Sequence, residues 1–183
     1  ADAVPTWLLD PDLPMIILSV MVVLVGLGLG AGDNLHYMLR TFNWRMLLLP
    51  LCTIVGTLLF SALGVLVLRG FSLTDCLAVG SGFGYYSLSS IFITEYKGAE
   101  LGTIALLANI SREILTLLAA PLLVRWFGNL APISAGGATT MDTTLPIITR
   151  TAGQQFVVVS IFHGFVVDFS VPFLVTFLCS ISF

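Results

Sequence analysis

Two adjacent ionisable residues, Arg112 and Glu113, lie in the middle of an otherwise uncharged apolar stretch that runs from Thr103 to Val124. About ten helical residues, a rise of roughly 15 Å, separate them from each end of the stretch. A charge at the centre of a membrane helix costs about 2.5 to 3.5 kcal/mol, so each is expected to contact a partner or a water-filled cavity. Because adjacent residues of a helix point about 100° apart, Arg112 and Glu113 do not simply neutralise each other.

A polar stripe accompanies these charges on the same predicted helix. Asn109, Glu113 and Thr116 follow one another at spacings that place them on one helical face. We expect this face, together with the neighbouring arginine, to line a site for a polar solute. In the alternative interpretation the charges form ion pairs between helices that only fix the packing, and the partner of the arginine is Asp142 or Asp168.

Two further apolar stretches are interrupted by glycines and polar residues. The first contains Gly80–Ser90, with three alternating glycines that each cost about 1 kcal/mol relative to alanine inside a helix. The second contains the threonine-rich Gly136–Pro146. Unwound backbone at membrane depth needs protein or water partners, so a cavity is expected beside residues 80–90. The side chain of Tyr86 either lines this cavity or packs as an aromatic residue. The candidate substrate- or ion-binding residues of the two segments are Gly84, Tyr86, Ser87, Thr140, Asp142 and Thr143.

Asp142 allows two interpretations. The threonine hydroxyls and freed carbonyls around it can coordinate a cation; alternatively, Asp142 or a neighbouring threonine caps a half-helix that has Pro146 in its first turns. His163 and Asp168 lie five residues apart on the last apolar stretch, a spacing that does not indicate a coupled pair. We interpret His163 as a hydrogen-bonded structural residue, and we retain His163, Asp168 and Thr116 as possible site residues only.

The composition is that of a membrane protein. Of 183 residues, 57% are hydrophobic and 9% are charged, whereas about a quarter of the residues of a soluble domain are charged. Six apolar stretches cover residues 14–31, 46–68, 76–94, 103–124, 128–149 and 156–183. The predicted fold is therefore all-α, a polytopic integral membrane protein with about five to six membrane segments, two of them broken or discontinuous helices. We expect a single transmembrane domain over residues 1–183, with a polar N-terminal segment at 1–13 and the membrane region at 14–183.

The basic residues give an indication of topology. If every stretch crosses the membrane, Lys97 and Arg150 lie on the same side together with Arg40 and Arg45, and the positive-inside rule assigns that side to the cytoplasm. If residues 128–149 instead re-enter as a hairpin, Arg150 changes sides.

Several classes of protein are not expected. The net charge is −3 and no basic run is present that would bind nucleic acid. The three cysteines form no CxxC pair, and no Ser–His, HExxH or paired-aspartate constellation of an enzyme is present. We therefore expect neither an enzyme nor a nucleic-acid-binding protein, and neither a metal nor a cofactor.

Several separate stretches follow one another in a characteristic order. They are Gly82–Ser89, Arg112–Leu115 followed by Pro121–Leu123, Gly136–Ile148, and the His163–Gly164 step in the last helix. On these motifs, which together extend over roughly residues 20–180, the chain resembles the LysO-type lysine exporter family.

The resemblance implies a multi-pass secondary transporter of the bacterial inner (cell) membrane. Such a transporter exports L-lysine and toxic lysine analogues and needs an embedded acid, here Glu113. Usual members of the family are longer and begin with additional helices, so the chain is similar to their C-terminal membrane portion. A small membrane subunit that supplies these helices, as in split forms of the family, or a homodimer is therefore expected.

The chemistry of lysine suits the residues in the middle of the predicted helices. Its two ammonium groups need acids, and its carboxylate needs an arginine or a helix N-terminus. We expect Glu113 to bind an ammonium, or to exchange it for a proton in antiport, while Arg112 or the half-helix ends near residues 84 and 142 hold the carboxylate. The alternatives are a channel, a transporter of another small polar or cationic solute with the same site, and a non-transporting structural membrane subunit.

Overall fold

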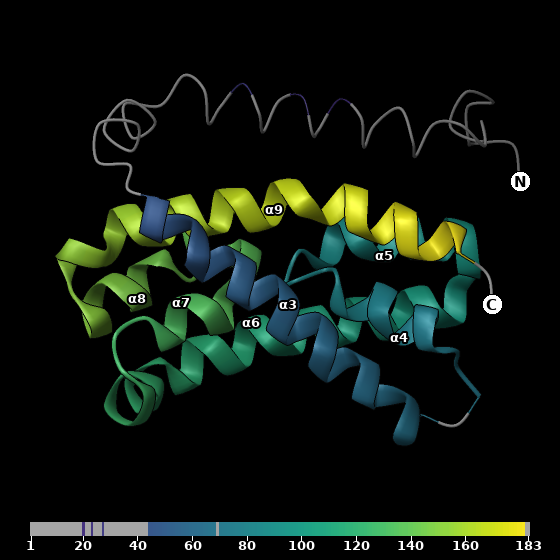
Figure 1. Ribbon diagram of the computed structural model, residues 1–183, viewed down its shortest axis with the longest axis horizontal. Coiled ribbons are helices and arrows are strands. Elements are labelled where there is room, and N and C mark those ends of the chain that lie inside the picture. Colours follow the sequence, from purple (N-terminus) through teal and green to yellow (C-terminus); the bar gives the residue numbers. More distant parts are fainter. Residues whose placement is uncertain (1–19, 21–22, 24–26, 28–43, 69, 182–183) are drawn as a thin grey trace, which may run out of the picture. The chain divides into compact units, whose positions relative to one another are not determined.

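The computed structural model describes residues 20, 23, 27, 44–68 and 70–181 (Figure 1). The chain divides into two compact units, residues 1–41 and residues 42–183, and the fold described below is that of the second unit. The predicted crossing over residues 14–31 lies almost entirely outside the described residues.

Three long apolar helices form the frame of this unit. They are α3 (Leu48–Ala62), preceded by the 3₁₀ turn η2 (Trp44–Leu47) and extended by η3 (Leu63–Leu66), α6 (Ala99–Phe127), and α9 (Val157–Ser180), preceded by η5 (Gln154–Phe156). The apolar spans Leu48–Leu66, Ala99–Phe127 and Gln154–Ser180 contain 19, 29 and 27 residues and have a mean hydropathy of 2.1, 1.5 and 1.9. A crossing needs about 20 apolar residues, so each of the three is suited to span a bilayer. The prediction of an all-helical, polytopic membrane protein is confirmed.

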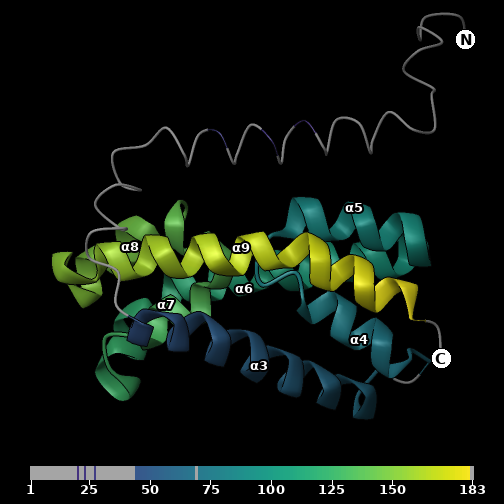
Figure 2. The same cartoon turned by 45° about the horizontal axis from the view of Figure 1, so that its top comes forward.

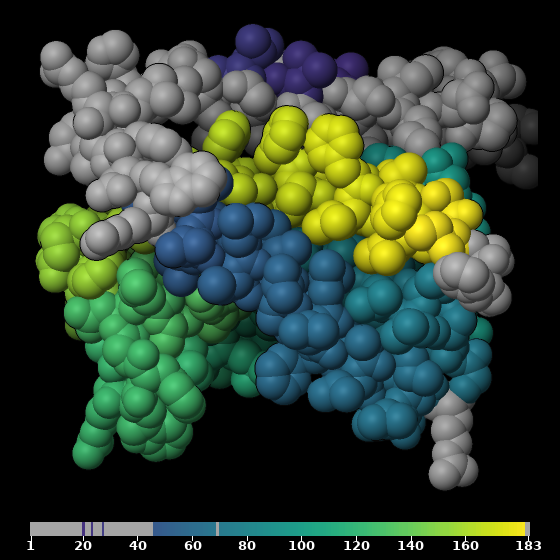
Figure 3. Space-filling model, in the orientation of Figure 1, coloured from purple at the N-terminus to yellow at the C-terminus, as the bar shows by residue number. Residues whose placement is uncertain are grey.

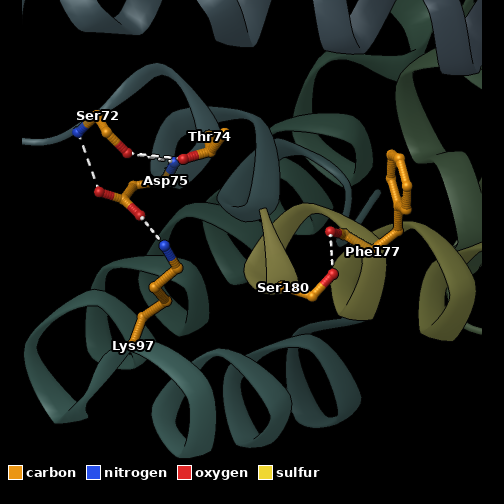
Figure 4. Close-up of polar contacts among 6 residues, drawn as sticks. All are labelled: Ser72, Thr74, Asp75, Lys97, Phe177 and Ser180. Carbon is orange, nitrogen blue, oxygen red and sulfur yellow. Dashed lines mark hydrogen bonds and ion pairs between the residues drawn. The ribbon is translucent and has the colours of Figure 1, made fainter. Parts of the chain in front are cut away.

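The first broken segment is a helical hairpin, here named hairpin one (residues 73–97). Its arms are α4 (Leu73–Gly80) and α5 (Tyr86–Lys97), which rise about 12 Å and 18 Å and are therefore too short to cross a hydrocarbon core of about 30 Å. The two outer ends meet, because the Lys97 ammonium lies 3.2 Å from Oδ1 of Asp75 (Figure 4). Asp75 also accepts a hydrogen bond from the Ser72 amide in the capping box that begins α4.

The second broken segment is also a hairpin, here named hairpin two (residues 131–152). Its elements are α7 (Ala131–Gly136), the 3₁₀ turn η4 (Gly137–Met141) and α8 (Leu145–Ala152). The outer ends of its arms are held together by an apolar cluster of Ile133, Ile148 and Ala152. Partly buried residues from the start of α3, the end of α6 and the start of α9 pack against this cluster, namely Leu49, Val124, Phe156 and Val159.

The two hairpins enter the helix bundle from opposite ends. Gly64, in η3 directly after α3, lies against Cys76 in hairpin one, whereas Leu49, at the start of α3, packs on hairpin two. Figures 1 and 2 show α4 and α5 beside one end of α9 and α7 and α8 beside the other. Three crossing helices and two hairpins give five membrane segments in the described part of the chain, within the predicted range.

The hairpins correct the topology expected for a chain in which every apolar stretch crosses. Lys97 closes hairpin one, and Arg150 lies in the outer half of α8. The two residues therefore lie at opposite ends of the bundle and not on the same side. Of the two possibilities left open for residues 128–149, a crossing and a hairpin, the structure contains the hairpin.

Candidate functional site

The tips of the two hairpins contact each other at the middle of the bundle. The amide of Ala138, in hairpin two, donates a hydrogen bond of 3.0 Å to the carbonyl of Phe83, in hairpin one. A Cβ atom on Gly137 would collide with that carbonyl, and Gly137 has a φ of 64°. At Gly84, φ is 97° and a Cβ atom would lie 3.2 Å from the Gly136 carbonyl. Glycine is required at both positions because it alone combines this backbone conformation with so close an approach.

Asn109, predicted to line the site, holds the tip of hairpin one. Its Oδ1 accepts a hydrogen bond of 2.8 Å from the Gly84 amide, and its Nδ2 donates to the carbonyls of Val79 and Ala105. The residue is 3% exposed. Both polar atoms of the amide thus bind backbone groups, and the turn at residues 81–84 obtains the protein partners that unwound backbone needs.

Arg112 connects three elements around the tips. Its Nε and Nη2 donate to the carbonyls of Ala135 and Ser134, at 2.8 Å and 3.0 Å, and its Nη1 donates to Oγ1 of Thr57 at 3.3 Å. The guanidinium also lies 5.9 Å from the centre of the Phe83 ring. A cation at the last carbonyls of a helix is stabilised by the helix dipole, which accounts for its place at the end of α7. Among the described residues it forms no ion pair, so the predicted alternative partners, Asp142 and Asp168, do not neutralise it.

Two cavities meet at Arg112. One, of about 260 Å³, lies between α3, α4 and α6, and the other, of about 660 Å³, lies between α3, α6 and α7. Both are lined by Thr57, Ser61 and Arg112. Figure 3 shows the face of the molecule on which the blue surface of α3 lies beside the green surface of α7. The smaller cavity reaches Gly80, so the cavity predicted beside residues 80–90 is present at the start of that segment.

Glu113 lies outside the lining of both cavities. It is half-buried at the centre of α6, and within the described part of the chain it has neither a hydrogen bond nor an ion pair.

Two further acids lie near the tips. Asp142, in the turn after η4, and Asp168, at the centre of α9, interact electrostatically with each other and with the Tyr85 hydroxyl. Asp142 is exposed and accepts a hydrogen bond of 2.5 Å from the Thr143 amide. The residue at the N-cap of α8 is Thr144, and no side chain caps this helix. Asp142 is therefore not the cap. A neighbouring threonine, Thr144, does occupy the N-cap position, although its side chain forms no capping hydrogen bond, and Pro146 lies in the first turn of α8.

His163 belongs to a buried chain of hydrogen bonds. Its Nδ1 lies 3.2 Å from Oγ1 of Thr140, and its Nε2 lies 2.9 Å from Oγ1 of Thr53, which donates in turn to Oγ of Ser134 at 3.0 Å. Thr140 also donates to the Ser160 carbonyl. These contacts agree with the structural role predicted for His163, and they place Thr140 inside hairpin two and not on an open surface.

The remaining predicted site residues are spread around the tips. Tyr86 is exposed and Ser87 half-buried in the first turn of α5, Thr143 is exposed, and the buried Thr116 donates to the Arg112 carbonyl within α6. Sequence reasoning missed Thr53, Thr57, Ser134 and Phe83. The first two are single threonines in an apolar helix, and no spacing in the sequence distinguishes them from residues that only pack.

A membrane protein in which two re-entrant hairpins bring unwound backbone and unpaired charge to the middle of the bilayer has the architecture of a transporter. The chain belongs to the lysine exporter family LysO, whose family model matches residues 3–179. It is 32% identical over 160 residues to "Lysine exporter LysO" of Escherichia coli (strain K12), an alignment that covers 87% of this chain and 52% of the relative. It is 41% identical over 108 residues to "Putative lysine exporter" of Haemophilus influenzae, covering 59% of this chain and 55% of the relative. No solved structure matches the chain.

The chain thus spans about half the length of the curated relatives that it matches. Its family is one of lysine exporters. Together with the three apolar helices, membership of this family places the chain in the bacterial inner membrane as a multi-pass protein.

Proposed function

We propose that this chain forms the transport site of an exporter that moves L-lysine and toxic lysine analogues out of the bacterial cytoplasm in exchange for protons. The observation that carries the proposal is the position of Glu113, a half-buried carboxylate without a protein partner at the centre of α6, next in sequence to the arginine that joins the hairpin tips. The names of the two relatives support lysine as the solute.

The acids near the hairpin tips suit the two ammonium groups of lysine. Glu113 binds one ammonium, and Asp142, exposed in the turn before α8, is available to the other. Since α5 and α8 begin at the tips, their N-termini also direct amide groups towards the middle of the bundle, where they attract a carboxylate. The same unwound region thus offers charge of both signs to an amphoteric solute.

Arg112 is available to the carboxylate of lysine from the cavity side. A guanidinium has five N–H groups, and three of those of Arg112 are used by Ala135, Ser134 and Thr57. The two others have no protein partner in the described part of the chain. Because Arg112 lines both cavities, a carboxylate that enters either of them can reach these groups.

Proton exchange follows from the chemistry of a single carboxylate. A carboxylate binds either an ammonium or a proton, and occupation by one excludes the other. Glu113 therefore releases lysine when it is protonated from the outside and takes up lysine when it is deprotonated on the inside. This coupling distinguishes the exporter from a channel, which would conduct lysine in the absence of a proton gradient.

We also propose that this chain assembles with a small membrane subunit or with a second copy of itself. The alignments cover 52% and 55% of the curated relatives. Purification of the tagged chain from its native membrane, followed by mass spectrometry and measurement of the particle mass, distinguishes the two. A particle with the mass of a single chain would contradict both.

The decisive experiment is lysine efflux from cells loaded with a lysine-containing dipeptide. Glu113→Gln is expected to abolish efflux with an unchanged amount of protein in the membrane, and the matched control Glu95→Gln, at an exposed position of α5, is expected to retain it. Efflux from the Glu113→Gln strain at the rate of the unmodified chain would refute the proposal. In proteoliposomes, lysine flux that does not respond to an imposed pH gradient would identify a channel instead.

A further inference from the structure

The described membrane part of the chain contains two halves of the same construction. Residues 73–127 and residues 131–180 each consist of a short helix, a turn with a glycine of positive φ, a second short helix, another such glycine and a long helix. The halves run in opposite directions, because hairpin one enters at the end of α3 and hairpin two at its start. Figure 2 shows the consequence, with the two hairpins at opposite ends of α9. The halves therefore form an inverted repeat.

The glycines before the long helices set the register of this repeat. Gly98 ends α5 with φ 94° and ψ 167°, and Gly153 ends α8 with φ 113° and ψ 156°. The offset between them is 55 residues, from 153 − 98. With this offset four buried positions of α6 coincide with buried positions of α9, in the pairs Ala105 and Ser160, Asn109 and Gly164, Thr116 and Val171, and Ala120 and Val175, whereas the other buried positions of the two helices do not pair.

In the same register Glu113 corresponds to Asp168. Both are half-buried, and both lie at the centre of a long helix. Within the part of the chain that the structure describes, they are the two carboxylates in the middle of a crossing helix, and neither has a hydrogen bond or an ion pair with another residue. Arg112 corresponds to Val167, so the repeat preserves the acid and not the arginine.

We propose that Asp168 is the counterpart of Glu113 in this inverted repeat and acts as a second cation-binding carboxylate of the translocation path. The inference rests on the proposed function, and it adds to that function a residue on α9. In transporters built from an inverted repeat, one half moves against the other when the site changes its access from one side of the membrane to the other. Equivalent acids on α6 and α9 give a cation one carboxylate ligand when the site is open to one side of the membrane and another when it is open to the other side.

The surroundings of Asp168 suit a cation. The tip of hairpin two, which carries Asp142, packs against α9 at Gly164, one turn before Asp168, where a Cβ atom would collide with Met141 and Thr140. The nearest basic side chain on α9, His163, is occupied on both ring nitrogens by Thr140 and Thr53. The Asp168 carboxylate itself has no hydrogen bond and no ion pair with another described residue, so both of its oxygens are available as ligands for an ammonium.

The experiment is lysine counterflow in proteoliposomes that contain the full chain together with any subunit that copurifies with it. Asp168→Asn is expected to lower the rate of counterflow about tenfold or more, because it removes one partner of a largely water-free pair of carboxylate and ammonium. Asp168→Glu keeps the carboxylate and is expected to retain most of the counterflow. The matched control Ser170→Ala removes a hydroxyl that bonds only to the Val167 carbonyl of the same helix, and it should transport as the unmodified chain does.

The outcomes separate this inference from the proposed function. Absence of lysine counterflow in the unmodified protein would overturn the function, whereas full counterflow in Asp168→Asn would overturn only the role of Asp168. If Asp168→Asn does not reach the membrane, Asp168→Cys and Glu113→Cys in a chain without other cysteines provide the test. Both thiols are expected to react with a water-soluble cationic thiol reagent, because a carboxylate of the translocation path is accessible to cations from water. If the thiol of the Asp168→Cys variant does not react while that of Glu113→Cys does, the inference is contradicted.

Discussion

The amide of Ala138 and the carbonyl of Phe83 form the backbone hydrogen bond that joins the tips of the two hairpins, with 3.0 Å between nitrogen and oxygen. Phe83 is fully buried and has a φ of 46°, which is uncommon for a residue other than glycine. Hairpin one therefore presents this carbonyl to hairpin two at a cost in backbone strain. The contact closes the middle of the bundle, so a solute that passes there must separate the tips or move with them.

Gly137→Ala is expected to break this contact. The added Cβ atom would collide with the Phe83 carbonyl, and alanine is disfavoured at the φ of 64°. Strain and collision together are expected to lower the free energy of unfolding by about 2 to 5 kcal/mol and to abolish export. Gly128→Ala is the matched control, because Gly128 has a φ of 90° with open space around it. Thermal unfolding in detergent and lysine efflux measure both effects; equal losses in the two variants would show that the tip contact contributes nothing.

Arg112→Lys is expected to loosen hairpin two although the charge is kept. An ammonium cannot reproduce the planar fork that donates to Ser134, Ala135 and Thr57 at once. The loss of a buried hydrogen bond from a charged group costs about 1.5 to 3 kcal/mol. Arg125→Lys, at an exposed position in the last turn of α6, should change stability by less than about 0.5 kcal/mol. Detergent unfolding curves compare the two, and an unchanged midpoint for Arg112→Lys would contradict the role of its bonds.

His163 and Thr53 are expected to be energetically coupled. His163→Leu leaves the Thr140 and Thr53 hydroxyls without their imidazole partner and should cost about 1 to 3 kcal/mol. In a double-mutant cycle with Thr53→Val, the coupling energy should exceed about 0.5 kcal/mol. The cycle of His163→Leu with Thr57→Val provides the control, because Thr57 binds Arg112 and not His163. If the two cycles give the same coupling energy, the hydrogen bond between His163 and Thr53 contributes nothing specific.

Much of the fold was predictable because its signals are local. The charges of Arg112 and Glu113 stand out against an apolar stretch, and the glycines of residues 80–84 and 136–137 disfavour a helix wherever they occur. Both properties depend on residue type and on neighbours within a few positions. The structure accordingly breaks its helices at these two runs and places the two charges at the centre of α6.

The direction of the chain after each break was not predictable from the sequence. A glycine run unwinds a helix whether the chain then continues across the membrane or turns back. Which of the two occurs depends on contacts between residues that are distant in the sequence, such as the hydrogen bonds between Asn109 and Gly84 and between Ala138 and Phe83. Whether Asn109 and Arg112 are free to bind a solute was likewise not predictable from the sequence. It depends on how many of their hydrogen-bond donors bind the unwound tips, and the tertiary structure sets that number.

The hairpin form of residues 73–97 gives the sharpest test of the topology. Asp75 and Lys97 form an ion pair at 3.2 Å, which requires both ends of hairpin one to lie at the same membrane face. In a chain whose native cysteines are replaced by serine, Asp75→Cys with Lys97→Cys is expected to be joined by a bifunctional thiol crosslinker of about the length of the lost side chains. Asp75→Cys with Arg150→Cys is not expected to be joined, because Arg150 lies at the opposite end of the bundle. An impermeant thiol reagent should label Lys97→Cys and Arg150→Cys from opposite sides of the membrane. Labelling of both from the same side would mean that at least one Gly-rich segment crosses, and the inverted repeat would then be lost together with the pairing of Glu113 and Asp168.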